Sequence, residues 1–153
     1  MKKDIYIIGK IVKFYIIFFL IFLVLNYFSK YLVDIVSLLV FHILNLLYSA
    51  KLINSTIILP NCSITIVKEC SGAFLYAVFL SLLVYAKNIK HILIGLFLLI
   101  LSFWINILRI VLIGIFLEYR FPKYIHDVVG YLLIVLSVPT LSFLYLKAVG
   151  EIK

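Results

Sequence analysis

Four long apolar stretches separated by short polar segments dominate the chain, and this pattern predicts membrane-spanning helices. A helix rises about 1.5 Å per residue, so roughly 20 apolar residues cross the hydrocarbon layer. The predicted spans cover residues 14–28, 70–86, 92–117 and 127–146. We therefore expect an all-α polytopic membrane protein in which residues 1–153 form a single membrane domain.

Residues 31–50 form a further apolar stretch with two interpretations. The stretch is long enough to cross a membrane, but its polar residues recur at helical spacing on one face. They are Asp34, His42, Asn45 and Ser49. A helix with one polar face can lie in the membrane interface. We adopt four spans plus an interfacial amphipathic helix, and an additional span at 31–50 is the alternative.

Residues 56–67 have a different texture, in which β-branched runs flank Pro60, Asn61 and Cys62. Such runs around a turn-forming cluster are typical of a short β-hairpin. Open strand edges cannot lie in hydrocarbon, because their N–H and C=O groups would lack partners. We therefore expect a short extracytoplasmic hairpin at 56–67.

The composition supports a membrane protein and argues against nucleic-acid binding. The chain of 153 residues is 67% hydrophobic, whereas soluble domains are about 45–50% apolar. Fourteen Lys and Arg against six Asp and Glu give a formal charge of +8. Most of the basic residues flank apolar runs, where they suit lipid headgroups and topology signals. No basic face is free of membrane, so we expect no nucleic-acid partner.

Three reactive side chains fall at one membrane depth when residues are counted. Cys70 lies 17 residues before Lys87, in the polar turn that follows the span, and Arg109 lies 18 residues after His91, in the same turn. The chain therefore crosses the membrane and returns to nearly the same level. His126 follows in the next loop on that side. A thiol, a guanidinium and an imidazole at one level predict a cysteine-nucleophile site.

The helical faces agree with this arrangement. Ser102, Asn106 and Arg109 form one polar stripe, and the last span has a second stripe. The second stripe consists of His126, Gly130 and Ser137, and the span 70–86 has a small-residue face of Cys70, Ala73, Ala77 and Ser81. Small faces allow membrane helices to approach closely. The three spans could then meet with their polar stripes inward.

Each candidate residue also has a simpler interpretation. A membrane cysteine often serves as a small packing residue, an arginine can anchor a span at the interface, and Asp127 can cap the last helix. Arginine at a bilayer centre costs about 2.5–3.5 kcal/mol, so Arg109 still requires a reason. Cys62 and Cys70 could pair in an oxidising compartment. We expect instead a free Cys70 thiol, a dispensable Cys62, and neither a metal nor a cofactor.

Three short motifs contain the candidate residues: Glu69-Cys70-Ser71-Gly72, Asn106-Ile107-Leu108-Arg109-Ile110 and His126-Asp127-Val128-Val129-Gly130. With these motifs the chain resembles the exosortase/archaeosortase family of membrane cysteine transpeptidases. The motifs occur in the family's order, with one span between the first and the second. The similarity covers roughly residues 57–146.

The resemblance implies a multi-pass protein of the cell membrane, with an extracytoplasmic active site and cytoplasmic termini. Such enzymes cleave a C-terminal sorting signal, made of a short motif, an apolar helix and a basic tail, from surface proteins. They join the new end to an acceptor, which in archaeal members is a membrane lipid. By motif, Cys70 is the expected nucleophile and Arg109 and His126 are its partners. Ser71, Asn106 and Asp127 are expected to support the site.

The chain departs from the family pattern in two respects. Some archaeal members have a second arginine where this chain has His126, and the chain has fewer leading spans than many members. The alternative function is a small non-catalytic membrane scaffold or subunit. A scaffold explains the hydrophobicity and charge, but it does not explain why three reactive groups share one depth.

Overall fold

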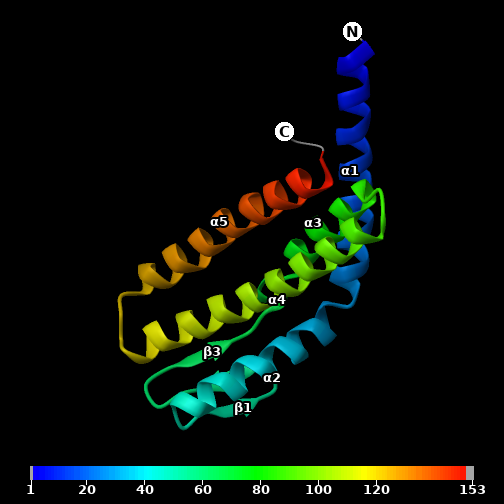
Figure 1. The fold of residues 1–153 in the computed structure, drawn as a ribbon. Coiled ribbons are helices and arrows are strands. Elements are labelled where there is room, and N and C mark those ends of the chain that lie inside the picture. Colours follow the sequence, from blue (N-terminus) through cyan, green and yellow to red (C-terminus); the bar gives the residue numbers. More distant parts are fainter. Residues whose placement is uncertain (1, 151–153) are drawn as a thin grey trace.

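Helices account for most of the computed structural model, which describes residues 2–150, and the side chains of these residues except 2–8, 10, 123 and 125–127. Figure 1 shows the elements in chain order. The long helices are α1 (Lys2–Tyr27), α2 (Ser29–Leu47), α4 (Ile89–Glu118) and α5 (Lys123–Val149). The shorter elements are β1 (Lys51–Ile53), β2 (Thr56–Ile58), β3 (Ser63–Thr65), the 3₁₀ turns η1 (Lys68–Ser71) and η2 (Leu83–Tyr85), and α3 (Ala73–Leu82). The expected helical class is confirmed.

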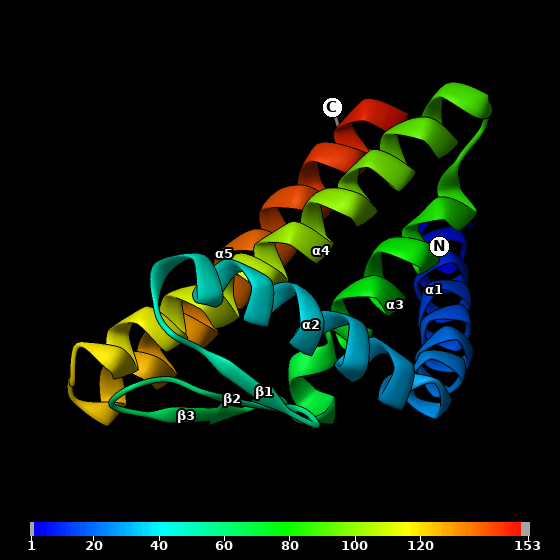
Figure 2. The ribbon, with the colours of Figure 1, turned by 90° about the horizontal axis from the view of Figure 1, so that it is seen from below.

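Helix α4 is central to the arrangement. It packs against α5, α3 and α2, whereas α1 packs mainly against α3. Figures 1 and 2 both show α5 returning alongside α4, and Figure 2 shows α2 crossing α4 from the other side. The start of α1, the turn between α3 and α4 and the end of α5 lie toward the upper part of Figure 1, and the sheet lies at the opposite end.

Three helices are long and apolar enough to cross a membrane: Ser29–Leu47, Ile89–Glu118 and Val128–Val149. Two shorter apolar helices cover Ile11–Tyr27 and Ala73–Tyr85. Helix α2 contains most of residues 31–50, the segment expected to lie in the interface, and this helix is long enough to span the membrane. Its buried side chains include Val36, Val40 and Leu44, whereas Asp34, His42 and Asn45 are exposed. The number of crossings stays a prediction.

The expected hairpin lies within a larger sheet. Strands β2 and β3 pair antiparallel with Ile57 opposite Ile64, and β1 adds a third strand to the other edge of β2. Ile57, Leu59 and Ile66 are buried in one apolar cluster with side chains of α2 and α4. One face of the sheet is thus packed against these helices, as amphipathic strands require.

The start of α3 differs from the predicted span, because Cys70 lies in η1 and the α-helix begins only at Ala73. Gly72 separates the two elements with φ +80°, a left-handed conformation that L side chains rarely adopt. A Cβ atom at Gly72 would lie 2.6 Å from Tyr76 Oη and 3.1 Å from Asn106 Nδ2. The close approach of α3 to α4 therefore depends on a glycine here.

We expect Gly72→Ala to destabilise the protein through the combination of backbone strain, about 1–3 kcal/mol, and a clash with Tyr76. Gly150→Ala is the matched control, since Gly150 has φ +77° but an added Cβ there would meet no side chain of the described residues within 4 Å. The melting temperature of each variant in detergent measures the difference. Equal shifts in the two variants would contradict the close contact at Gly72.

Candidate active site

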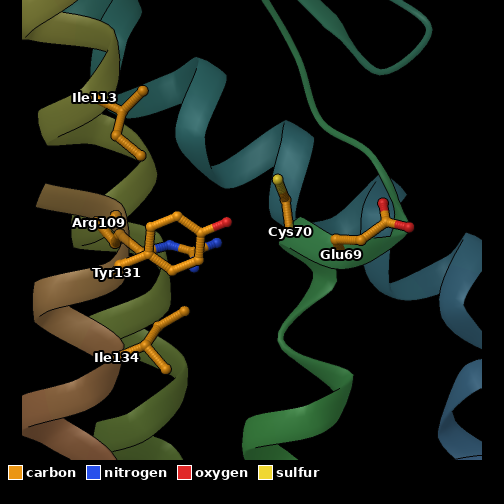
Figure 3. A pocket seen from close by; sticks show the side chains of 7 residues that line it. Glu69, Cys70, Arg109, Ile113, Tyr131 and Ile134 are labelled. Atoms are coloured by element: carbon orange, nitrogen blue, oxygen red, sulfur yellow. The ribbon is translucent and has the colours of Figure 1, made fainter. Parts of the chain in front are cut away.

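A cavity of about 280 Å³ opens between η1, α4 and α5. Its lining residues are Glu69, Cys70, Arg109, Ile113, Gly130, Tyr131 and Ile134. Figure 3 shows Cys70 on one wall and Arg109 on the facing wall, with the ring of Tyr131 beside Arg109. The carboxylate of Glu69 lies on the far side of Cys70 from Arg109 in this view. The structure thus brings together the thiol and the guanidinium that residue counting placed at one depth.

Cys70 is held through its backbone. The Nδ2 atom of Asn106 donates a hydrogen bond of 3.0 Å to the Cys70 carbonyl oxygen, and the Cys70 N–H donates to Val67 O at 2.9 Å. Its thiol is free and partly exposed. Since Asn106 is on α4, this contact fixes the start of the α3 segment to the helix that carries Arg109.

Arg109 is buried, with only 8% of its surface exposed. The other members of its predicted stripe, Ser102 and Asn106, are buried as well. Among the side chains that the structure describes, no carboxylate pairs with Arg109, and its Nε has no hydrogen-bond partner. A buried, unpaired cation is energetically costly. The cavity is therefore suited to an anionic group next to Arg109.

Two tyrosines at this site were not predicted from the sequence. Tyr76 is 6% exposed, and its hydroxyl is buried beside Gly72 and the Asn106 side chain. Tyr131 forms part of the cavity wall on α5. Its neighbour Gly130, which also lines the cavity, was on the predicted stripe of the last span. The sequence signal for Tyr131 was therefore its position directly after Gly130, a residue of the predicted stripe.

The remaining predicted site residues are His126, Asp127 and Ser71. His126 and Asp127 are in the first turns of α5, but their side chains lie outside the described residues, so their roles stay predictions. Ser71 is fully buried, and its Oγ accepts a hydrogen bond of 3.3 Å from the Ala73 N–H. Ser71 thus satisfies one of the free N–H groups at the start of α3 and does not line the cavity.

Cys62 lies at a second polar site, between β2 and β3. Its thiol donates to Glu118 Oε2 at 3.7 Å. Burial and the nearby Glu118 carboxylate raise the pKa of Cys62 from its ordinary value near 9 to about 11. Neither cysteine forms a disulfide. Within residues whose side chains are described, no group of three His, Cys, Asp or Glu could hold a metal ion.

Comparison with known proteins agrees with the motifs. The family described as "Transmembrane exosortase" matches residues 10–143. The chain is also 44% identical over 146 residues to "Probable archaeosortase E" of Methanocaldococcus jannaschii, covering 92% of this chain and 79% of that protein. No solved structure matches the chain. The length and identity of these matches show that the chain is a membrane protein belonging to the transmembrane exosortase family.

Proposed function

We propose that this protein is a membrane-embedded cysteine transpeptidase that cleaves the C-terminal sorting signal of surface proteins and transfers the new end to a membrane lipid. The observation that carries the proposal is the cavity that Cys70 shares with the buried Arg109, which has no carboxylate partner among the described side chains. Membership of the exosortase family supports this class of reaction. The name of the archaeal relative, a probable archaeosortase, points in the same direction.

In the first step, the Cys70 thiolate attacks the scissile carbonyl carbon of the substrate. A cation beside a thiol favours the thiolate, which is the nucleophilic form. A carbon–sulfur bond forms, and the carbonyl oxygen takes the negative charge of the tetrahedral intermediate. Arg109 faces the thiol across the cavity (Figure 3), where its N–H groups would stabilise this oxyanion. One such donor typically contributes about 10²–10³ in rate.

In the second step, the carbon–nitrogen bond breaks and the leaving amine needs a proton. We assign proton transfer to His126, which would accept the thiol proton and deliver it to the amine. General acid–base help of this kind is worth about 10²–10⁴ in rate. A nucleophilic group of the acceptor then attacks the thioester carbonyl and gives its proton to His126, which is neutral again after protonating the amine, and the Cys70 thiolate leaves. Ser71, Asn106 and Asp127 are proposed to support the site from neighbouring positions.

The arrangement of the helices supports an extracytoplasmic site. The start of α1, the α3–α4 turn and the end of α5 lie toward one side of the molecule, away from the sheet (Figure 1). With both termini and this turn in the cytoplasm, Cys70 would face the outside, as the resemblance implies. This orientation requires that α2 does not carry the chain back across the membrane.

Cys70→Ala should abolish processing of a membrane-tailed substrate, because no other group supplies the nucleophile, while the protein still inserts. Cys62→Ala is the matched control and should stay active. Arg109→Lys keeps the charge but loses the planar donor geometry, and we expect a rate loss of about 10²-fold. Mass spectrometry of the substrate checks all three. Full processing by Cys70→Ala would favour a non-catalytic scaffold.

Cys62 should be a poor nucleophile at neutral pH. With a pKa of about 11, only about one thiol in a thousand is ionised at pH 8. In the Cys70→Ala background, alkylation of Cys62 should be slow at pH 8 and rise until about pH 11. Glu118→Gln removes the neighbouring charge and should move the profile to lower pH. Rapid labelling of Cys62 at pH 8 would contradict this.

A reporter fused after Lys90 tests the orientation. Under the four-span arrangement the α3–α4 turn is cytoplasmic, so a reporter active only outside the cytoplasm should be silent there. The same reporter fused after Asn61 should be active, because the sheet is then extracytoplasmic. Signal from the Lys90 fusion would instead make α2 a span and place the site in the cytoplasm.

A further inference from the structure

Glu118 is a buried carboxylate that the mechanism above does not use. It is 7% exposed at the C-terminal end of α4. It accepts hydrogen bonds from the Asn61 backbone N–H at 3.1 Å and from Asn61 Nδ2 at 2.8 Å. The Cys62 thiol is its third donor. Arg120 in turn donates to Asn61 Oδ1 at 3.4 Å, so the turn between β2 and β3 is bound to the end of α4.

A carboxylate is an unfavourable choice for packing at this position. The C-terminal end of a helix carries partial negative charge, which repels an anion. Burial also removes the carboxylate from water, which is costly unless donors replace the solvent. The donors on Asn61 and Cys62 supply this compensation only when the β2–β3 turn is seated on Glu118. The contact is therefore specific to one position of the turn.

The segment from Asn61 to Gly72 runs beside α4 in the opposite direction. At the middle of the segment, a Cβ atom added to Gly114 would lie 2.9 Å from Ile64 Cδ1, so β3 approaches α4 closely there. At the far end, Asn106 is hydrogen-bonded to the Cys70 carbonyl. From the C-terminal end of α4 toward its N-terminal end, the residues of the segment that contact the helix therefore come later and later in the sequence.

Because the segment runs antiparallel to α4, the place where Asn61 is bound to Glu118 affects the position of Cys70 along the helix axis. Glu118 and Arg109 are nine residues apart on α4, or about 13.5 Å along the helix axis. The segment from Asn61 to Cys70 runs beside this length of α4, from the hydrogen bond at Glu118 to the one at Asn106. A shift of the β2–β3 turn along α4 would therefore be transmitted to the thiol, and would change its distance from the Arg109 guanidinium.

Apolar packing alone does not fix this register. The sheet is held against α2 and α4 by Ile57, Leu59 and Ile66, and such contacts are non-directional. Each strand has only three residues, so the ladder gives little resistance to sliding. The directional contacts at the two ends of the segment are those made by Glu118 and Asn106.

We propose that Glu118 is a positioning residue, which sets the register of the 61–72 segment on α4 and thereby holds the Cys70 thiol opposite Arg109. The inference rests on the proposed function for its consequence in catalysis. The placement itself is independent of any substrate, because the hydrogen bonds from Asn61 and the packing at Gly114 are internal to the protein.

The test uses the whole chain in a Cys62→Ser background, which keeps a hydrogen-bond donor beside Glu118 and leaves Cys70 as the single thiol. Glu118→Ala should slow iodoacetamide labelling of Cys70 about tenfold, toward the rate of Arg109→Ala, because the thiol loses its cation. With a membrane-tailed substrate, kcat should fall about 10–100-fold with KM nearly unchanged, since displacements near 1 Å can cost this much. Asp34→Ala removes an exposed carboxylate instead, and should leave labelling and kcat unchanged.

A charge exchange separates register from simple loss of stability. Asn61→Asp places two carboxylates together and should resemble Glu118→Ala. Combining Asn61→Asp with Glu118→Gln restores an amide–carboxylate pair with its direction reversed, and should recover at least half of the lost labelling rate. Thermal unfolding of each variant confirms that the folded protein is being measured.

The labelling experiment and the processing assay test different claims, so their failures can be told apart. Wild-type labelling rates in folded Glu118→Ala and Asn61→Asp would overturn the positioning role, whatever the processing assay shows. Lack of recovery in the exchanged pair would also overturn it. Slowed labelling together with full processing by Cys70→Ala would uphold the positioning role and reject the proposed transpeptidase.

Discussion

The hydrogen bond from Asn106 to the carbonyl oxygen of Cys70 is the contact on which the candidate site depends. It joins the segment that carries the thiol to the helix that carries the guanidinium. The bond can form because Gly72 brings the backbone against Tyr76 and the Asn106 amide. Asn106 is almost completely buried, so leaving its amide unpaired would cost about 1–3 kcal/mol. The position of Cys70 is therefore set by backbone geometry, which leaves its thiol free for chemistry.

The membrane environment explains why polar contacts have this importance. Lipid tails are as apolar as the helix surfaces, so the hydrophobic effect does not drive one span against another. Close approach at small residues and a few hydrogen bonds then decide which helices meet and in which register. The buried face of α3 contains Ala73, Ala77 and Ser81, and the directional contacts between the 61–72 segment and α4 are those of Asn106 and Glu118. The chain places its polar contacts at the points where sliding would misplace the site.

Counting residues predicted the height of the groups but not their neighbours. The rise per residue is nearly constant in a helix, so Cys70 and Arg109 could be placed at one level, and the polar stripe of α4 could be assigned to its inner face. The left-handed Gly72 that ends the helix short of Cys70 depends on tertiary packing, as does the position of Tyr76. Strand β1 escaped notice because Lys51–Ile53 contains a single β-branched residue, whereas the hairpin was predicted from runs of them. Glu118 and Asn61 are 57 residues apart, and no local periodicity connects them.

The two cysteines show how surroundings assign different roles to one side-chain type. Burial of the Cys62 thiol, together with the neighbouring Glu118 carboxylate, raises its pKa to about 11. Cys70 instead faces a buried guanidinium with no carboxylate partner among the described side chains. The same Glu118 that contributes to the raised pKa of Cys62 also binds the turn that leads to Cys70. One buried carboxylate thus acts on one thiol and helps to place the other, which is why the two roles are best tested in the same set of variants.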